Sequence, residues 1–552
     1  MVHISVSSIE LTPEDDPLAA CKHLITTYYL EQVDSMKDQS WPPIKDMGFI
    51  QLALIKQARG SQSCKFQTVY GQIDEIIGDK TSINFDSMFN DLQDGSRVLL
   101  EGRPGSGKST LMLKVSNDWA KGKILKKKLV FLVQLRRLRG EVNLDLHSLL
   151  SMSSQILSAS EYIGPLCFHI DKQKGEGVVF ALDGLDEYAP GTDESNLIYK
   201  LISKLYLPRS SVIVASRPAA TQQFRKLATT WIEVVGFLKD QVLQYISNYF
   251  DDDKAQELKL HLKQHPNLMN MAYLPLHCAM LVFLFEEETV LPETETEFYK
   301  HFTLSTLLRC IRKRVLECPK GYFILSSFEH LPYDDKALFY EVCNLAFSAT
   351  VASKQVFRFS ELKGIALKRD STGSDESSLG LVVIDRYFMR YGCDETYTFL
   401  HLTFQEYLAA VHIARLSKHQ QMKLISAHHE RHLYVVWRFL CGMMDFTSTC
   451  TSSMDTFKSL MGISGDILFQ MHCCYESQHS SPCTYVINTF GGHVEFNNYN
   501  FSPSDCVAIG YVINQSDCKP VDLSFNECNF SFEGAVAILR QLDNHPFLLS
   551  LK

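Results

Sequence analysis

The clearest chemical signature in the chain is the motif GRPGSGKST at positions 102–110. A short apolar run at residues 98–100 precedes it, and a segment with apolar residues at helical spacing follows. A strand, a glycine-rich loop and a helix in this order are the context that a phosphate-binding P-loop requires. The motif therefore predicts that the chain binds a nucleoside triphosphate or diphosphate. A glycine turn with an exposed lysine is the alternative interpretation.

The positions of this motif have different expected roles. Gly102 permits the tight turn off the strand, and residues 103–107 would direct backbone N–H groups at a β-phosphate, aided by the positive end of the helix dipole. Lys108 would bring positive charge to the β- and γ-phosphates, and the Ser109 hydroxyl would complete a Mg²⁺ shell. The expected nucleotide-binding residues of the motif are Gly102, Arg103, Pro104, Gly105, Ser106, Gly107, Lys108, Ser109 and Thr110.

A second candidate element is the apolar run at residues 178–182, which ends at Asp183. Such a run is typical of a strand buried on both faces of a parallel sheet. Open α/β sheets place their ligand chemistry at the carboxyl ends of strands, so we expect Asp183 to hold Mg²⁺ through water. Asp186 or Glu187 could polarise an attacking water as general base, and the spacing does not decide between them. The alternative is a strand followed by an acidic turn.

A third expected strand, SSVIVASRP, carries Arg217 at its end. An arginine there could sense a γ-phosphate and stabilise charge in the transition state, whereas the structural alternative is an ion pair with a nearby carboxylate. Further apolar runs begin at Leu129 and Trp231, which gives about five strands alternating with helical stretches. This pattern predicts a doubly wound α/β fold with a parallel sheet.

Length and composition limit the possible classes of protein. A chain of 552 residues is expected to form several domains, and 45% hydrophobic with 21% charged residues is ordinary for a globular protein. The net charge of −9 gives no support to charge-driven binding of nucleic acid. We interpret the basic residues within 126–128 and 136–139 as solvated ends of a buried strand.

Cysteine usage and the chain start predict a cytoplasmic location. The 16 cysteines include no C-x-x-C pair and no zinc-finger spacing, so they are expected to be reduced and mostly buried. The first residues show no basic segment followed by an apolar core, so no signal peptide is evident. The longest apolar stretch, residues 274–285, is too short to cross a bilayer and predicts a core helix.

Outside the sheet, hydrophobic periodicity predicts mostly helices. The expected elements are helices over 18–33, 238–249, 267–287 and 292–318, and a strand over 49–55.

The later part of the chain contains a predicted cap, a loop and a repeat. Thr403 and Glu406 predict a capping box at the start of a helix, and the polar residues 370–378 predict a mobile loop. FSPSDCVAIG, from Phe501, aligns with FSFEGAVAIL, from Phe530, at an offset of 29 residues. Strand–helix units of this period are typical of leucine-rich repeats.

Four motifs, in this order, resemble those of the NACHT-domain NOD-like receptors, the animal branch of the STAND NTPases. They are GRPGSGKST, FALDGLDE, IVASRP and FLHLTFQEYLAA. The linking segments YLPLHCAMLVFLF and LPETETEFYKHF are similar too. The resemblance covers roughly residues 90–420 and extends more weakly to the terminal repeats.

The resemblance implies a series of domains. They are an N-terminal region without a clear effector domain (1–85), a NACHT nucleotide-binding domain (86–236), a first helical domain (237–303), a winged-helix domain (304–412), a second helical domain (413–500) and the start of leucine-rich repeats (501–552). It also implies that Pro275 packs near the adenine and that His401 contacts the β-phosphate of ADP. A helix-start proline and a core histidine at a strand–helix corner are the respective alternatives.

The resemblance further implies a signalling regulator switched by ATP and ADP. Such a protein would be locked by ADP at rest, would self-associate on activation, and would act as a cytoplasmic innate immune or cell-death sensor. A slow Mg²⁺-dependent ATPase would reset it, and the repeats would bind a protein or microbial ligand. The alternatives are a AAA+-like remodelling ATPase and a non-catalytic, nucleotide-bound scaffold. Against the remodeller, the sequence shows no second-domain G-x-R sensor.

Overall fold

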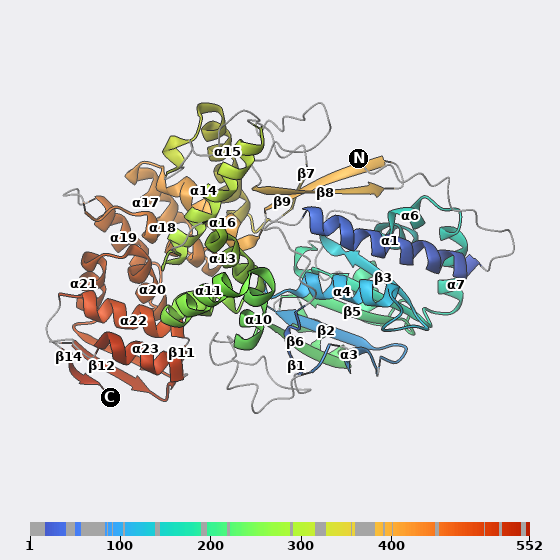
Figure 1. Cartoon of the computed structure of the whole chain (residues 1–552), viewed down its shortest axis with the longest axis horizontal. Helices are drawn as coiled ribbons and strands as arrows, with labels where there is room; N and C mark the ends of the chain where they lie inside the picture. Colours follow the sequence, from blue (N-terminus) through green and yellow to red (C-terminus); the bar gives the residue numbers. More distant parts are fainter. Residues whose placement is uncertain are drawn as a thin grey trace.

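The computed structural model describes residues 17–39, 50–56, 83–85, 87–90, 92–102, 105–138, 144–188, 196–217, 221–287, 291–314, 327–354, 356–358, 381–389, 392–399, 401–447, 452–501, 503–517, 521–530, 532–542 and 548–551. An α/β region lies at the right of Figure 1, and a helical region followed by C-terminal strand–helix units lies at the left. One cluster of buried apolar residues extends from Cys21 to Leu542 and connects these regions.

The α/β region is built on a six-stranded sheet with the order β1-β6-β2-β5-β4-β3. Its strands are β1 (Ala53–Lys56), β2 (Arg97–Gly102), β3 (Leu129–Gln134), β4 (Val178–Asp183), β5 (Ser211–Ser216) and β6 (Thr230–Gly236). The pairings among β2 to β6 are parallel, which confirms the predicted parallel α/β sheet. Every residue of β2, β4 and β5 is buried, so both faces of the sheet are covered, as their apolar runs predict.

Short helices surround this sheet. They are α1 (Pro17–Gln39), α3 (Ser87–Asn90), α4 (Lys108–Ala120), η2 (Leu135–Leu138), α5 (Leu146–Ser153), α6 (Gln155–Ser158), α7 (Ile163–Lys172), η3 (Leu185–Glu187), α8 (Leu197–Ile202) and η4 (Gln222–Leu227). α1 begins close to the helix start predicted at residue 18.

The N-terminal elements pack as part of the α/β region. β1 pairs antiparallel with β6, and α1 packs against α4. The Tyr29 hydroxyl of α1 accepts a hydrogen bond from Leu132 N at 2.7 Å and donates one to Val130 O at 3.3 Å. Since β3 is an edge strand, this buried phenol takes the place of a neighbouring strand there. The domain boundary at residue 85 stays a prediction.

A helical region follows the sheet. It contains α10 (Lys239–Tyr249), α11 (Asp252–Gln264), α12 (Pro266–Ala272), α13 (Pro275–Glu287) and α14 (Glu295–Arg314). The single helix predicted over 267–287 is divided into α12 and α13. Pro275 explains the division, because a proline disfavours helical backbone in the residue before it and is well tolerated at a helix start.

A small antiparallel sheet and more helices come next. They are η5 (Phe328–His330), α15 (Tyr333–Val351), β7 (Val356–Arg358), β8 (Val382–Met389), β9 (Gly392–Phe399), α16 (Leu402–Ala414), α17 (Lys418–Ala427), η8 (Arg431–Leu433), α18 (Tyr434–Met443), α19 (Ser452–Met461), α20 (Ile467–Ser477) and α21 (Ser480–Thr489). The strands pair in the order β7-β9-β8. The loop predicted at 370–378 lies outside the described residues.

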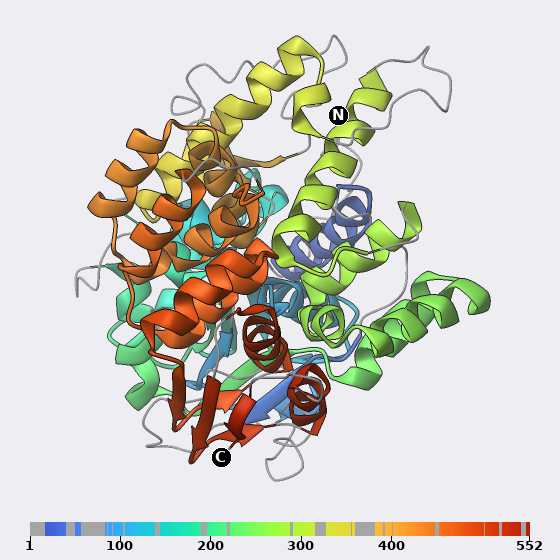
Figure 2. The same cartoon turned by 90° about the vertical axis from the view of Figure 1, so that its left-hand side faces the viewer.

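The C-terminal part consists of repeated strand–helix units. They contain β10 (His493–Asn497), β11 (Asn500–Phe501), α22 (Pro503–Gln515), β12 (Val521–Asn526), β13 (Asn529–Phe530), α23 (Phe532–Leu542) and β14 (Leu548–Leu551). Phe501 pairs with Phe530, which confirms the 29-residue offset. The strands β10, β12 and β14 lie side by side in red at the bottom of Figure 2. The Phe496 and Phe525 rings stack at 5.5 Å between consecutive units.

A buried arginine joins two elements of the α/β region. The Arg97 side chain donates to Ile202 O at 2.9 Å, Leu201 O at 2.8 Å and Ser210 O at 2.5 Å. Loss of solvation lowers the pKa of Arg97 to about 10. These three carbonyls lie at the end of α8 and just before β5, so one guanidinium ties the two elements together through their backbone.

We predict that Arg97→Met destabilises the α/β region strongly. Each buried carbonyl that loses its donor costs about 1–3 kcal/mol, so the Tm should fall by roughly 5–10 °C. Arg209→Met is the matched control, because Arg209 is 55% exposed and pairs with Glu176 at the surface, where an ion pair is worth less than about 1 kcal/mol. Differential scanning calorimetry of both variants checks this. Equal Tm values for the two would contradict the structural role of Arg97.

Candidate functional site

The glycine-rich loop lies between β2 and α4, in the strand–loop–helix order that the sequence predicts. Gly105 has φ +74° and Gly107, the N-cap of α4, has φ +93°, conformations that side chains other than glycine rarely adopt. A Cβ atom at Gly102 would lie 2.6 Å from Val234 O. Arg103 and Pro104 lie outside the described residues. The loop therefore requires glycine at these positions, at Gly105 and Gly107 for the positive φ angles and at Gly102 for the close approach of β6.

The polar groups of the loop fit a phosphate. Lys108 Nζ donates to Gly102 O at 2.8 Å, which holds its charge over the loop. The Ser106 hydroxyl is buried and has no hydrogen-bond partner among the described residues. Ser109 and Thr110 are exposed in the first turn of α4. A phosphate would satisfy the buried hydroxyl and the free N–H groups at the helix start.

The expected acidic residues follow β4. Asp183 is the last residue of that strand, is 8% exposed, and lies in register with Ala215 of β5. Glu187 ends η3, and its side chain lies outside the described part of the structure. Asp183 thus occupies the carboxyl edge of the sheet, on the same edge as the loop that follows β2.

Arg217 forms the ion pair that was the structural alternative for it. Its Nε lies 2.8 Å from Asp186 Oδ2, and its backbone N–H donates to Asp186 Oδ1 at 3.2 Å. The Ser216 hydroxyl donates to the same oxygen at 3.0 Å. The Asp186 carboxylate is therefore occupied by three donors, and the structure brings Arg217 and Asp186 together.

His401 lies against the glycine-rich loop although it is distant in sequence. Its Nε2 atom lies 3.3 Å from the position that a Cβ would take at Gly105. Leu276 Cβ of α13 lies 3.5 Å from the same position. Gly105 is thus enclosed by residues of α13 and by the residue before α16. A side chain at this position would displace one of them.

The start of α16 differs from the prediction. His401 is the N-cap residue, and its Nδ1 accepts from Thr403 N at 3.3 Å, so the capping box of Thr403 and Glu406 is wrong. Thr403 lies inside the helix, where its side chain hydrogen-bonds Tyr299. The imidazole nitrogen accepts a hydrogen bond from a backbone N–H group in the first turn of the helix, as the side-chain hydroxyl of a serine or threonine N-cap would.

The hydrogen bond at Nδ1 determines the tautomer of His401. Since Nδ1 accepts, the neutral ring carries its proton on Nε2. This Nε2 is buried and has no hydrogen-bond partner among the described residues. Burial lowers the pKa of His401 to about 3, and the nearby charges of His277, Arg217 and Lys108 add to that effect. An N–H donor in a cationic, buried position fits an anionic group such as a phosphate.

Pro275 is the first residue of α13, beside the end of β6. Its Cδ lies 3.4 Å from the Cβ position of Gly236, and Phe237 N donates to Tyr273 O at 2.8 Å. Gly236 has φ +131°, and a Cβ there would lie 2.4 Å from Tyr273 O. The chain before α13 therefore approaches β6 closely enough to require glycine.

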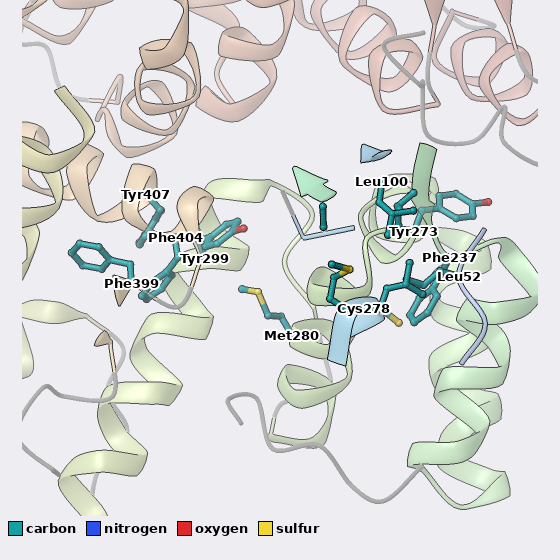
Figure 3. Packing of buried hydrophobic residues seen from close by; sticks show 14 of the residues in the cluster. Leu52, Leu100, Phe237, Tyr273, Cys278, Met280, Tyr299, Phe399, Phe404 and Tyr407 are labelled. Atoms are coloured by element: carbon teal, nitrogen blue, oxygen red, sulfur yellow. The ribbon is translucent and has the colours of Figure 1, made fainter. Parts of the chain in front are cut away.

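Sequence analysis missed a polar pair behind His401. His277 Nε2 lies 2.8 Å from the Tyr299 hydroxyl, and both side chains are buried. The Tyr299 ring stacks on Tyr407 at 5.7 Å, and Figure 3 shows both beside Phe404. The pair was detectable as a histidine and a tyrosine placed within the two linking segments YLPLHCAMLVFLF and LPETETEFYKHF.

Sequence analysis also assigned Glu406 to the wrong role. Glu406 is buried within α16, and this burial raises its pKa to about 8. The positive charges of Arg217 and Arg438 oppose that shift. The arginine after β5 therefore interacts electrostatically with α16 as well as with Asp186.

The described residues contain neither a metal-binding cluster nor a membrane-spanning helix. No group of three or more His, Cys, Asp or Glu side chains within them could hold a metal ion. No helix in the same residues is long and apolar enough to cross a membrane. Eleven cysteines in them are free thiols, most of them buried, as predicted.

Comparison with known proteins identifies the α/β region. Residues 96–253 match the family model of the NACHT domain. NACHT, LRR and PYD domains-containing protein 3 of Homo sapiens is 25% identical over 394 residues, covering 66% of this chain and 35% of that protein. NACHT, LRR and PYD domains-containing protein 1 homolog of Danio rerio is 24% identical over 535 residues, covering 83% of this chain and 36% of that protein. The chain thus spans about a third of the length of these relatives.

A solved structure gives only a faint likeness. It is described as the structure of Drosophila ORC bound to DNA, with 9% identity and a TM-score of 0.26, and the match covers 73% of this chain and 94% of that chain. It carries no argument about function. The glycine-rich loop, the parallel sheet and the family match together show that residues 96–253 are a NACHT domain, and the chain is similar to NACHT, LRR and PYD domains-containing proteins.

Proposed function

We propose that this chain is a signalling switch controlled by adenine nucleotide, in which ADP holds the resting state closed. One observation carries the proposal: the buried Nε2–H of His401 lies at the glycine-rich loop and has no hydrogen-bond partner in the described part of the chain. When bound, the nucleotide supplies the negative charge of its phosphates. Lys108 and the loop N–H groups would hold that charge on one side, and His401 would donate to it from the other.

The same geometry suggests how closure depends on nucleotide. His401 belongs to α16, whereas Gly105 belongs to the NACHT domain, so a phosphate bound to both would tie the two parts together. Without it, the buried donor costs free energy, because a buried polar group without a partner is unfavourable. Residues 304–412 would act as the winged-helix domain that carries the histidine. Pro275 would pack near the adenine.

A slow Mg²⁺-dependent ATPase would fit the acidic edge of the sheet. Ser109 and Asp183 would hold Mg²⁺, and Asp186 or Glu187 would orient the attacking water. Asp186 is held by Arg217 and Ser216, so it could serve as general base only after its ion pair with Arg217 opens. Arg217 likewise could contact a γ-phosphate only after the same ion pair opens. An enzyme that must break an ion pair before each turnover is suited to resetting a switch.

The wider role follows from the resemblance. We propose an innate immune or cell-death sensor in the cytoplasm that self-associates on activation and binds a protein or microbial ligand through its terminal repeats. The 29-residue strand–helix units support the assignment of those repeats as leucine-rich. A AAA+-like remodeller is not favoured, since the relatives carry NACHT domains.

A substitution of His401 tests the proposed latch, by which we mean the tie that His401 makes to the NACHT domain through a bound phosphate. His401→Leu keeps the bulk but removes the donor, and a charge-assisted hydrogen bond is worth roughly 1.5–3 kcal/mol, so ADP should dissociate about 10- to 150-fold faster. Stopped-flow release of a fluorescent ADP analogue measures this. His412→Leu is the control, because His412 lies on the same helix and stacks on Phe347 away from the loop.

The latch is wrong if His401→Leu leaves ADP release unchanged. A purely structural histidine would instead lower the Tm equally with and without ADP. Measuring release and Tm on the same variant separates these results.

The second prediction concerns pH. The pKa of His401 is depressed to about 3 without nucleotide, so this group stabilises the closed form above its ordinary pKa of 6.5, and that stability is lost as the pH falls toward 3. A bound phosphate would raise the pKa, so ADP binding should take up protons and strengthen relative to His401→Gln as the pH falls from 7.5 to 5.5. Calorimetry in buffers of different ionisation enthalpy measures this uptake.

Comparing the wild-type protein with His401→Gln cancels the proton uptake of groups that both proteins contain. Glu406, with its pKa raised to about 8, works in the opposite direction: the stability it contributes is present below pH 4.5 and is lost as the pH rises to 8. Both proteins contain Glu406, so its effect cancels in the difference. Equal proton uptake by the two proteins would show that His401 does not meet the phosphate.

The third prediction separates a switch with turnover from a scaffold. Asp183→Asn should lose Mg²⁺-dependent ATP hydrolysis by at least about 100-fold and keep part of its ADP affinity, since a metal carboxylate serves the γ-phosphate more than the β-phosphate. Asp171→Asn, an exposed carboxylate of the same domain, is the control. Wild-type hydrolysis in Asp183→Asn would exclude Asp183 as the metal ligand. A wild-type protein that retains ADP without any turnover would favour the scaffold.

A further inference from the structure

The amino-terminal ends of the parallel strands form a face opposite the nucleotide site. Three segments contribute to it: 121–128 before β3, 168–177 before β4, and 203–210 before β5. We call these segments, together with Lys22, the basal face. Backbone hydrogen bonds join them, since Leu129 N donates to Gly177 O at 2.9 Å and Arg209 N donates to Lys174 O at 3.0 Å.

The basal face carries an excess of positive charge. Lys126, Lys127, Lys172 and Lys174 are exposed, and none of them pairs with a carboxylate among the described residues. Lys22 reaches the same face, where its Nζ donates to Lys126 O at 3.0 Å. This concentration is local, because the whole chain has a net charge of −9.

The acidic residues near these lysines are mostly engaged. Asp94 pairs with Lys128 at 2.9 Å, and Glu176 pairs with Arg209 at 2.7 Å. Asp171 is exposed but accepts a hydrogen bond from the Tyr206 hydroxyl. The unpaired lysines therefore dominate the charge of the face.

Two large apolar side chains project from the same face. Phe168 of α7 is 71% exposed and Leu205, in the turn after α8, is 66% exposed. The hydrogen bond from the Tyr206 hydroxyl to Asp171 joins α7 to the turn that contains Leu205. Among the described residues only Tyr333 is a more exposed large hydrophobic side chain.

We propose that the basal face docks on an anionic phospholipid bilayer. Clustered lysines are attracted to acidic headgroups, and exposed phenylalanine and leucine side chains insert at the boundary between headgroups and acyl chains. A single-stranded nucleic acid fits less well, because it is held by aromatic side chains that stack on bases, and Leu205 cannot stack; a duplex is held through its phosphates and gives the exposed Phe168 and Leu205 no apolar partner. Docking in this way leaves the nucleotide site, at the opposite edge of the sheet, accessible.

The test uses the full chain and sedimentation with sucrose-loaded vesicles. The protein should bind vesicles of phosphatidylcholine with 30% phosphatidylserine and should not bind pure phosphatidylcholine. Raising the salt concentration should weaken the binding, because screening shortens the reach of the lysine charges. Each lysine near an anionic surface strengthens binding roughly fivefold. The double substitution Lys126→Glu with Lys127→Glu should therefore lower the partition coefficient by more than about tenfold.

The apolar contribution has its own variant. Phe168→Ser with Leu205→Ser should also lower partitioning by about tenfold or more, because two side chains lose their burial in the bilayer. The matched controls are Lys263→Glu with Lys423→Glu for charge and Leu260→Ser for apolar exposure, since all three residues are exposed away from the basal face. All variants should keep ADP affinity, which shows that they are folded.

Three outcomes would overturn the proposal. The first is equal binding to neutral and anionic vesicles, or none to either. The second is an equal loss of binding in the control variants. The third is tight binding of a single-stranded RNA that Phe168→Ser with Leu205→Ser does not weaken, together with weak binding to vesicles, which would assign the lysines to nucleic acid.

Discussion

A histidine ring against a glycine backbone is the constraint on which the arrangement of this chain depends. Gly105 has no side chain, so His401 and Leu276 can both approach the loop where a Cβ would lie. The N-cap bond to Thr403 fixes the ring and leaves its remaining proton directed at the loop. The NACHT domain, α13 and α16 thus meet at one residue. A Cβ there would press against His401 Nε2 and would be strained at φ +74°.

Polar contacts extend from this point into the later helices. Tyr299 hydrogen-bonds His277 and stacks on Tyr407, and beyond it Arg438 of α18 pairs with Glu295 at the start of α14. The buried Glu476 of α20 accepts from Thr296 N at 2.9 Å, where it satisfies the free N–H groups at the start of α14. The helices after α16 are therefore attached to α14 by specific polar groups, and such groups tolerate little sliding, because a buried charge that loses its partner is costly.

The sequence predicted best the features that depend on neighbouring residues. The strand–loop–helix around Lys108 and the 29-residue offset of Phe501 and Phe530 are local or periodic patterns, and the structure contains both. It predicted poorly the polar residues whose partners are far along the chain. Arg97 bonds to carbonyls more than 100 residues away, and nothing around it distinguishes it from an ordinary charged residue at a strand start. The predicted cap at Thr403 is wrong because the N-cap lies two residues earlier, at His401, which accepts a hydrogen bond from Thr403 N.

The Tyr29 phenol on β3 has a consequence for how copies of this chain can associate. A sheet edge normally offers its free N–H and C=O groups to a strand from another molecule. Here one hydroxyl occupies both Val130 O and Leu132 N, and β1 covers the opposite side of the parallel strands by antiparallel pairing with β6. While α1 stays docked, the NACHT sheet cannot be extended by strand addition at β3. Strand addition to this sheet is then limited to the outer edge of β1, the terminal strand at its other side.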